Sequence, residues 1–317
     1  MQFETSDAVL AWWALLCAVS AVNVGAWLLA ARAMRLRVRR GDAQVLHAWP
    51  VRQLQLGLSA AYVLGCAYRS ASPVFDVQRL CLFDHWLASV AVGRSVATLA
   101  ELCFVLQWAL LLRVASQGTG HPRAARIGAW LSALMVALIG IAEVCSWYAV
   151  LSTSNLGHVA EESLWAVSAT LFVLGLMAIW PRCERALRPL LTAGIVAGLA
   201  YVAYLAWVDV PMYWARWVSD EAAGRHYLGL AAGLADVSAH WVVSHRWADW
   251  RSEVVWMTLY FSVAVWLSIG LAHVPLPMPL PMRRALALAP ASASPRDRRG
   301  SGARPAGRAA HQRQVRA

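Results

Sequence analysis

Two pairs of residues with helical spacing could hold a metal ion. His158 and Glu162 are four positions apart, and Asp236 and His240 have the same spacing. Side chains with this spacing lie on one face of a helix, where both can bind the same ion. Imidazole and carboxylate ligands suit zinc, which activates a bound water for hydrolysis. The four residues predict a zinc site if the fold brings the two pairs together.

The same residues allow two other interpretations. His158 and His240 could be the axial ligands of a haem. Alternatively, Glu161 and Glu162 stabilise the positive end of a helix dipole, and Asp236 with His240 forms an ordinary pair on a solvated helix. The sequence has no HExxH motif, so spacing alone leaves these alternatives open.

A second polar group lies inside two apolar stretches. Arg94, Thr98 and Glu101 fall on one face of a helix, and Glu143 lies at a similar depth in the next stretch. Charges in apolar spans are costly and are usually paired or functional. We therefore predict an ion pair between Arg94 and Glu143. The four residues are either a polar seam that fixes helix contacts or the proton or ion path of a transporter.

The absence of lysine excludes several chemistries. All 28 basic residues are arginine, so no Schiff base can form with retinal or pyridoxal phosphate. A phosphate-binding loop of the Gly-Lys-Ser/Thr kind is also absent. The formal charge of +11 is not accompanied by any nucleic-acid-binding motif, so we expect no nucleic-acid partner.

The composition indicates a membrane protein that is almost entirely helical. Apolar residues make up 60% of the chain, charged residues 14%, and the mean hydropathy is +0.51. A helix that crosses a bilayer needs roughly 20 mostly apolar residues. Seven stretches qualify: 8–31, 52–71, 86–112, 127–151, 161–180, 189–209 and 253–274. Because lipid tolerates no unpaired backbone amides, we predict an all-α, polytopic bundle of seven transmembrane helices.

The arginines predict how this bundle is oriented. Most of them lie in the loops 32–51, 113–126 and 181–188 and in the tail after residue 282. Short arginine-rich loops stay in the cytoplasm, which places the N-terminus outside and the C-terminus in the cytoplasm. Arginines beside the membrane also attract anionic lipid head groups, by about 1 kcal/mol each. We expect a multi-pass protein of the cell (inner) membrane.

Two segments lie outside the predicted spans. The segment 210–252 is predicted to be an outer loop with an interfacial or re-entrant helix, although 227–247 is apolar enough to be an eighth span. An eighth span would move the arginine-rich tail outside, against the charge rule. Residues 1–274 therefore form the predicted transmembrane domain. Residues 275–317, rich in proline and arginine, form a predicted disordered cytoplasmic tail.

Histidines, acids and tryptophans gather toward the predicted outer side. This asymmetry favours an outward-facing site beneath the segment 210–252. The site would belong to a metal-dependent hydrolase or would bind a lipid-like molecule. The alternatives are a transporter that uses Arg94, Glu101 and Glu143, and a non-catalytic membrane subunit or sensor with an unknown protein partner. Pairing among the predicted outer cysteines stays open: Cys66, Cys81 and Cys145.

Overall fold

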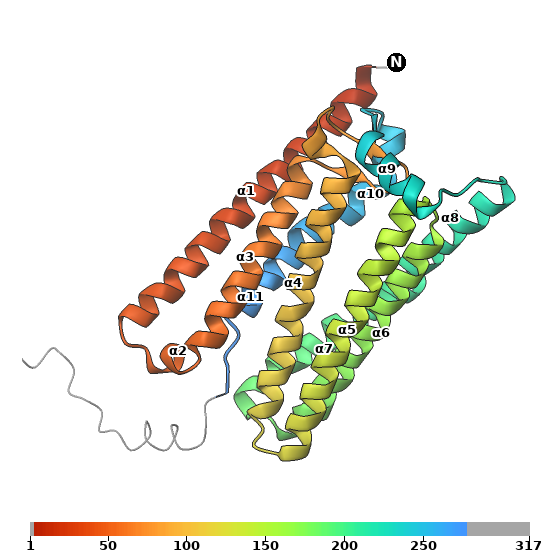
Figure 1. The fold of residues 1–317 in the computed structure, drawn as a ribbon. Helices are drawn as coiled ribbons and strands as arrows, with labels where there is room; N and C mark the ends of the chain where they lie inside the picture. The colour runs from red at the N-terminus through yellow and green to blue at the C-terminus, as the bar shows by residue number, and fades with distance from the viewer. Residues whose placement is uncertain (1–2, 278–317) are drawn as a thin grey trace, which may run out of the picture. The chain divides into compact units, whose positions relative to one another are not determined.

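The protein is a bundle of long helices with a small sheet at one end (Figure 1). The computed structural model describes residues 3–277, so nearly all of the predicted tail 275–317 falls outside the described residues. The helices are α1 (Phe3–Arg39), α2 (Ala43–His47), α3 (Trp49–Ala71), α4 (Val90–Gln117), α5 (Pro122–Ser152), α6 (Leu156–Ile179), α7 (Arg188–Tyr204), α8 (Val210–Ala222), α9 (Leu230–Ala239), α10 (Trp247–Leu259) and α11 (Val265–Leu271).

Two of the long helices contain a π-helical turn. The turn η4 (Leu205–Asp209) joins α7 to α8, and the turn η5 (Tyr260–Ala264) joins α10 to α11. Each joined pair is one continuous helix. Because π-turns in helices occur frequently at functional sites, both turns are candidates for site-forming elements.

Six helices in the described part of the chain are long and apolar enough to cross a membrane. Their bounds are Asp7–Arg39, Val90–Gln117, Pro122–Ser152, Leu156–Arg182, Arg188–Ala222 and Trp247–Leu271. The second predicted span corresponds to α3, which has 23 residues. It lies between α1 and α4 (Figure 1), but Arg52, Gln55 and Arg69 lower its hydropathy.

The helix predicted at 189–209 continues far into the segment predicted as an outer loop. It runs through η4 and α8 to Ala222. The apolar stretch ends at Asp209, but this acid is buried inside the bundle, so it does not mark the edge of the membrane span. The rest of that segment holds α9, of 10 residues, and the strand β3 (Val242–Val243). Neither approaches the roughly 20 residues that a crossing requires.

A three-stranded sheet departs from the all-helical prediction. The strands β1 (Val74–Phe75) and β2 (Leu80–Cys81) are antiparallel, and β2 pairs in parallel with β3. Arg79 adopts a left-handed conformation with φ of 57° and places its Nε atom 2.8 Å from a carboxylate oxygen of Asp236. Strands of two residues leave no alternating pattern, so the sequence could not reveal them.

A buried polar network locks α3 into the bundle. The side chain of Gln107 on α4 donates to the carbonyl oxygens of Gln55 and Ser268, each at 3.2 Å. The hydroxyl of Ser268 on α11 donates to Gln107 Oε1 at 2.6 Å. Interhelical bonds of this kind fix neighbouring helices in apolar surroundings. The side chain of Gln55 in turn donates to the carbonyl oxygen of Gln107 at 2.9 Å, so one of the polar residues that lower the hydropathy of α3 also holds the helix in place.

Candidate functional site

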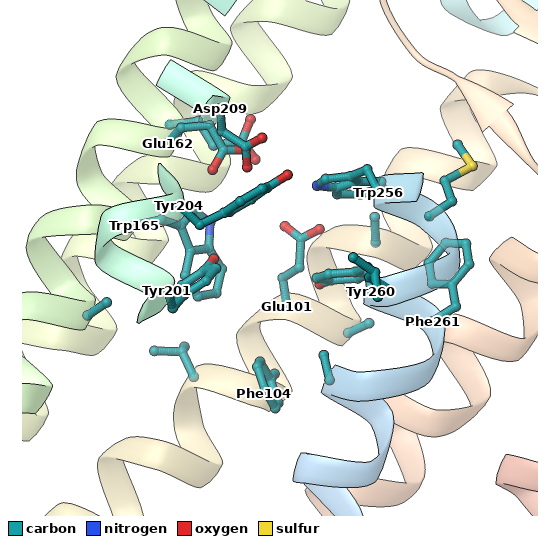
Figure 2. Close-up of a pocket in the computed structure, with 18 of the residues that line it drawn as sticks. Glu101, Phe104, Glu162, Trp165, Tyr201, Tyr204, Asp209, Trp256, Tyr260 and Phe261 are labelled. Carbon is teal, nitrogen blue, oxygen red and sulfur yellow. The ribbon is translucent and has the colours of Figure 1, made fainter. Parts of the chain in front are cut away.

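The described helices enclose a cavity of about 550 Å³. Most of its wall comes from α4, α6, the continuous helix α7–η4–α8 and the continuous helix α10–η5–α11 (Figure 2), with additional residues from α3, α5 and the β1 segment. Both π-turns contribute, because Asp209 of η4 and Tyr260 of η5 line it. Glu162 and Asp209 lie at one end of the view in Figure 2, Glu101 lies midway, and Phe104 lies at the other end.

Arg94 is the electrostatic centre of the site. Its Nη2 atom lies 2.8 Å from Glu101 Oε2 and 2.8 Å from Glu143 Oε2, with Glu161 Oε1 at 3.7 Å. Its Nη1 atom lies 3.9 Å from a carboxylate oxygen of Asp76. The ion pair predicted between Arg94 and Glu143 is therefore present. One guanidinium serves four carboxylates from α4, α5, α6 and the segment between β1 and β2.

Thr98 extends this network to the next helix. Its hydroxyl donates to Glu143 Oε2 at 2.7 Å and accepts a bond from Trp147 Nε1 at 3.1 Å. The polar residues predicted within the apolar stretches thus lie together, and Arg94 and Glu101 line the cavity. Charged hydrogen bonds of this length are about twice as strong as neutral ones.

His158 pairs with Glu161 and not with Glu162. The distance from His158 Nδ1 to Glu161 Oε2 is 2.6 Å, and the ring of Tyr213 lies 4.9 Å from the imidazole. Both acids follow His158 within one helical turn, so spacing did not distinguish them. Both acids line the cavity, but of the two only Glu161 contacts Arg94, at 3.7 Å.

The four predicted metal ligands do not meet around one space. His158 and Glu162 line the cavity, whereas Asp236 and His240 do not. Asp236 binds Arg79 and also His240, 2.9 Å away, and the side chain of His240 is 79% exposed. The helix α9 ends at Ala239, and His240 faces outward. The same separation applies to the haem interpretation, which requires His158 and His240 on opposite faces of one cofactor.

Three other acidic and histidine residues on the predicted outer side, Asp84, His85 and His245, form hydrogen bonds that stabilise the local fold. Asp84 accepts a bond from Trp241 Nε1 at 3.1 Å, and His85 Nδ1 accepts from the amide of Ala88 at 2.9 Å. His245 Nε2 lies 3.0 Å from a backbone oxygen of the loop after β2. These contacts position the small sheet and the start of α4.

Among residues 3–277, one set of three acidic or histidine ligands converges closely. The carboxylates of Glu101, Glu143 and Glu161 offer oxygen atoms within 4.8 Å of one another. Arg94 lies among them at hydrogen-bonding distance from two. A metal ion at this point would have to displace the guanidinium that already supplies the positive charge. The donor set therefore suits an arginine better than zinc.

The cavity carries an excess of negative groups. Six carboxylates and two arginines line it, and the excess persists when Glu143 and Arg216, which pair with lining residues, are included. Arg216 of α8 pairs with Glu253 of α10 at 3.1 Å and lies over the ring of Phe75 at 5.4 Å. This bridge joins the two continuous helices on either side of the cavity.

Sequence reasoning missed four of the lining acids as site residues: Asp76, Glu161, Asp209 and Glu253. Asp209 and Glu253 stood at the ends of predicted spans, where charged residues are ordinary. A signal was nevertheless present. On a helix, Trp256 and Tyr260 follow Glu253 at three and seven positions and lie on the same face, so this acid is accompanied by aromatic residues.

All six cysteines lie within the described residues, and none of them forms a disulfide. Cys66 and Cys81 are buried, and Cys145 is partly buried. Burial raises the pKa of the Cys81 thiol to about 11. That thiol stays protonated at neutral pH and is a poor nucleophile for disulfide exchange.

Comparison with known proteins adds no further assignment, since no family model, curated protein or solved structure matches the chain. The function therefore has to be argued from the cavity itself. Its properties are an apolar enclosure, aromatic walls, one arginine shared by four acids, and an excess of carboxylates.

Proposed function

We propose that this chain is a multi-pass membrane protein whose helix bundle binds an amphipathic, lipid-like molecule in the cavity. One observation carries the proposal: the lining changes along the cavity from carboxylates at Glu162 and Asp209 to the apolar ring of Phe104 (Figure 2). The ring of Trp108 packs on Phe104 and that of Phe172 on Trp108, with centroids 5.9 Å and 4.9 Å apart, so they extend the apolar end. A ligand with a polar head and an apolar tail matches this gradient. The volume of about 550 Å³ lies within the roughly 300–1,000 Å³ of small-molecule sites.

A side entrance from the bilayer would suit such a ligand. The helix α7–η4–α8 packs mainly on α6, and only 11% of its most apolar window is buried. Its other neighbour around the cavity is α10–η5–α11, to which the Arg216–Glu253 pair connects it. An amphipathic molecule would enter between these two helices, tail first from the lipid.

Binding is favoured over two of the competing functions, hydrolysis and transport. A metal-dependent hydrolase needs an open coordination position, but Arg94 already lies among Glu101, Glu143 and Glu161. A transporter needs a path to the other side, but an apolar cluster around Leu112 and Leu176 packs beyond Phe172. Opening that path would require a second arrangement of the helices.

The proposal includes seven crossings, with α3 as the seventh and the arginine-rich loops in the cytoplasm. In Figure 1 the loops after α1, α4 and α6 lie at one end of the bundle, as this topology requires. Fusing a fluorescent protein or alkaline phosphatase after Gly41, Asp84 or Gly118 tests it. Fluorescence is expected after Gly41 and Gly118, and phosphatase activity after Asp84. Phosphatase inactivity after Asp84 would show that α3 does not cross.

Filling the cavity should abolish ligand binding without unfolding the protein. Ala169 on α6 lines the cavity, so Ala169→Phe would place a ring where the ligand lies. Val167 on the same helix is 49% exposed and lies outside the lining, which makes Val167→Phe a matched control. We expect the wild type and Val167→Phe to retain a co-purifying amphipathic molecule, detected by mass spectrometry of detergent-purified protein.

The expected loss in Ala169→Phe is nearly complete, because the cavity has room for the added ring and the ring then occupies space that the ligand needs. Monodisperse elution of both variants would confirm that they fold. Equal ligand content in Ala169→Phe and Val167→Phe would refute the cavity as the binding site.

A further inference from the structure

Glu162 and Asp209 are the carboxylates of the cavity that the ion-pair network leaves without a counter-charge. Glu162 comes from α6 and Asp209 from η4, and Figure 2 places them next to each other at one end of the cavity. Asp209 is only 3% exposed. Within residues 3–277 neither acid forms an ion pair, whereas the other four carboxylates that line the cavity each do.

Adjacent negative charges in an apolar enclosure are unfavourable unless a cation compensates them. Carboxylates repel each other strongly where the effective dielectric constant is low, and charges within spans are normally paired. Arg94 and Arg216 are each engaged elsewhere, with Glu101 and Glu143 and with Glu253 respectively. The compensating cation must therefore come from outside the chain's own arginines: protons when the cavity is empty, and the ligand when it is filled.

The surroundings of the two acids select the kind of cation. The aromatic side chains of Tyr201, Tyr204 and Trp256 line the cavity beside them (Figure 2). Calcium requires six to eight oxygen ligands and magnesium retains several waters, which this aromatic wall does not provide. An ammonium group needs only a carboxylate partner and aromatic neighbours, the combination that recognises organic cations.

We propose that the ligand is an amphipathic organic cation, with an amine or quaternary ammonium head and an apolar tail. This inference rests on the proposed function and names the chemical class of its ligand. The head lies between Glu162 and Asp209, and the tail extends past Glu101 toward Phe104 and Trp108. No ion pair of the Arg94 network has to break for this ligand to bind.

Protons should compete with the ligand, because both compensate the same carboxylates. The titratable and charged groups that face the pair are Arg94 and Glu101 of α4, Glu143 of α5, His158 and Glu161 of α6, Tyr201 and Tyr204 of α7, Tyr213 and Arg216 of α8, and Glu253 of α10. Of the arginines among them, Arg94 is shared by four acids and Arg216 pairs with Glu253. Lowering the pH should therefore weaken binding of the cation.

The test uses the full chain in lipid nanodiscs and tritiated octyltrimethylammonium as the probe. Unlabelled octanol and octyl sulfate, which carry the same tail on neutral and anionic heads, serve as competitors, and empty nanodiscs give the background. We expect saturable binding of the cation that neither competitor displaces. Glu162→Gln and Asp209→Asn should each weaken it by about 10- to 100-fold, because each removes one of the two carboxylate charges that attract the quaternary ammonium head in a low-dielectric cavity. Glu221→Gln, an exposed acid of α8 outside the lining, should leave it unchanged.

A second measurement separates recognition from folding. Replacing one acid of a pair that has no arginine partner should raise the unfolding temperature of the empty protein, because the folded chain no longer has to hold a proton on that buried acid. The same replacement should weaken cation binding, whereas a structural role would lower both the unfolding temperature and the binding. Displacement of the cation by octanol would overturn the cationic class but leave the amphipathic site intact. Wild-type affinity in both variants would overturn the assignment to Glu162 and Asp209. If Ala169→Phe bound the cation as the wild type does, the proposed cavity site itself would fail.

Discussion

Replacing Arg94 with leucine is expected to destabilise the protein by about 3–5 kcal/mol, the effect of removing one partner from a buried ion pair. Arg94 is 5% exposed and interacts with four carboxylates, two of them at 2.8 Å. Without the guanidinium these acids repel one another in an apolar interior. Thermal unfolding of the detergent-purified variant, followed by size-exclusion chromatography, measures the loss.

A control and a rescue distinguish this effect from loss of an ordinary arginine. Arg113→Leu, at an exposed position on the same helix, should change stability by less than about 0.5 kcal/mol. Adding Glu143→Gln to Arg94→Leu should recover part of the stability, because one unpaired charge is removed. The deficit of Arg94→Leu should also shrink as the pH falls, since the orphaned carboxylates then take up protons. An Arg94→Leu protein as stable as Arg113→Leu would contradict the central role of Arg94.

Exchanging the charges of Arg94 and Glu143 should restore little. A simple pair would recover on reversal, but a glutamate at position 94 would face Glu101, Glu161 and Asp76, which Arg94 now compensates.

The same geometry explains why the sequence could predict the pair but not its surroundings. Helical spacing and a short connection bring α4 and α5 together, so Arg94 and Glu143 could be paired from sequence. Glu161 of α6 and Asp76, between β1 and β2, also contact Arg94, but no local sequence pattern shows that these elements come close to α4.

The departures from prediction have a common physical cause. Helical spacing correctly linked Asp236 to His240, 2.9 Å apart, but could not tell that the hairpin residue Arg79 binds Asp236 away from the cavity. It offered two partners for His158 and could not choose between them, because Arg94 on another helix decides. In each case the spacing within an element was predictable and the direction of the side chain depended on a distant charge.

The largest effect outside the cavity is expected for Trp250→Ala. Trp250 on α10 is fully buried, packs against Trp12 of α1 with 5.8 Å between ring centroids, and donates to the carbonyl oxygen of Ser244 at 2.9 Å. Truncation to alanine leaves a large void, at about 3–5 kcal/mol of unfolding free energy.

Trp250→Phe should lose much less, because a ring still fills most of the space and only the hydrogen bond, about 1 kcal/mol, disappears. Trp266→Ala on the same continuous helix is the control: that side chain is 51% exposed, so little packing is lost. Because Trp250 anchors the helix that carries Glu253, Trp250→Ala should also loosen the Arg216–Glu253 bridge and weaken ligand binding. Both the unfolding temperature and the ligand content should therefore be highest in Trp266→Ala, lower in Trp250→Phe and lowest in Trp250→Ala. An intact ligand content in destabilised Trp250→Ala would show that the anchoring of α10 and the shape of the cavity are independent.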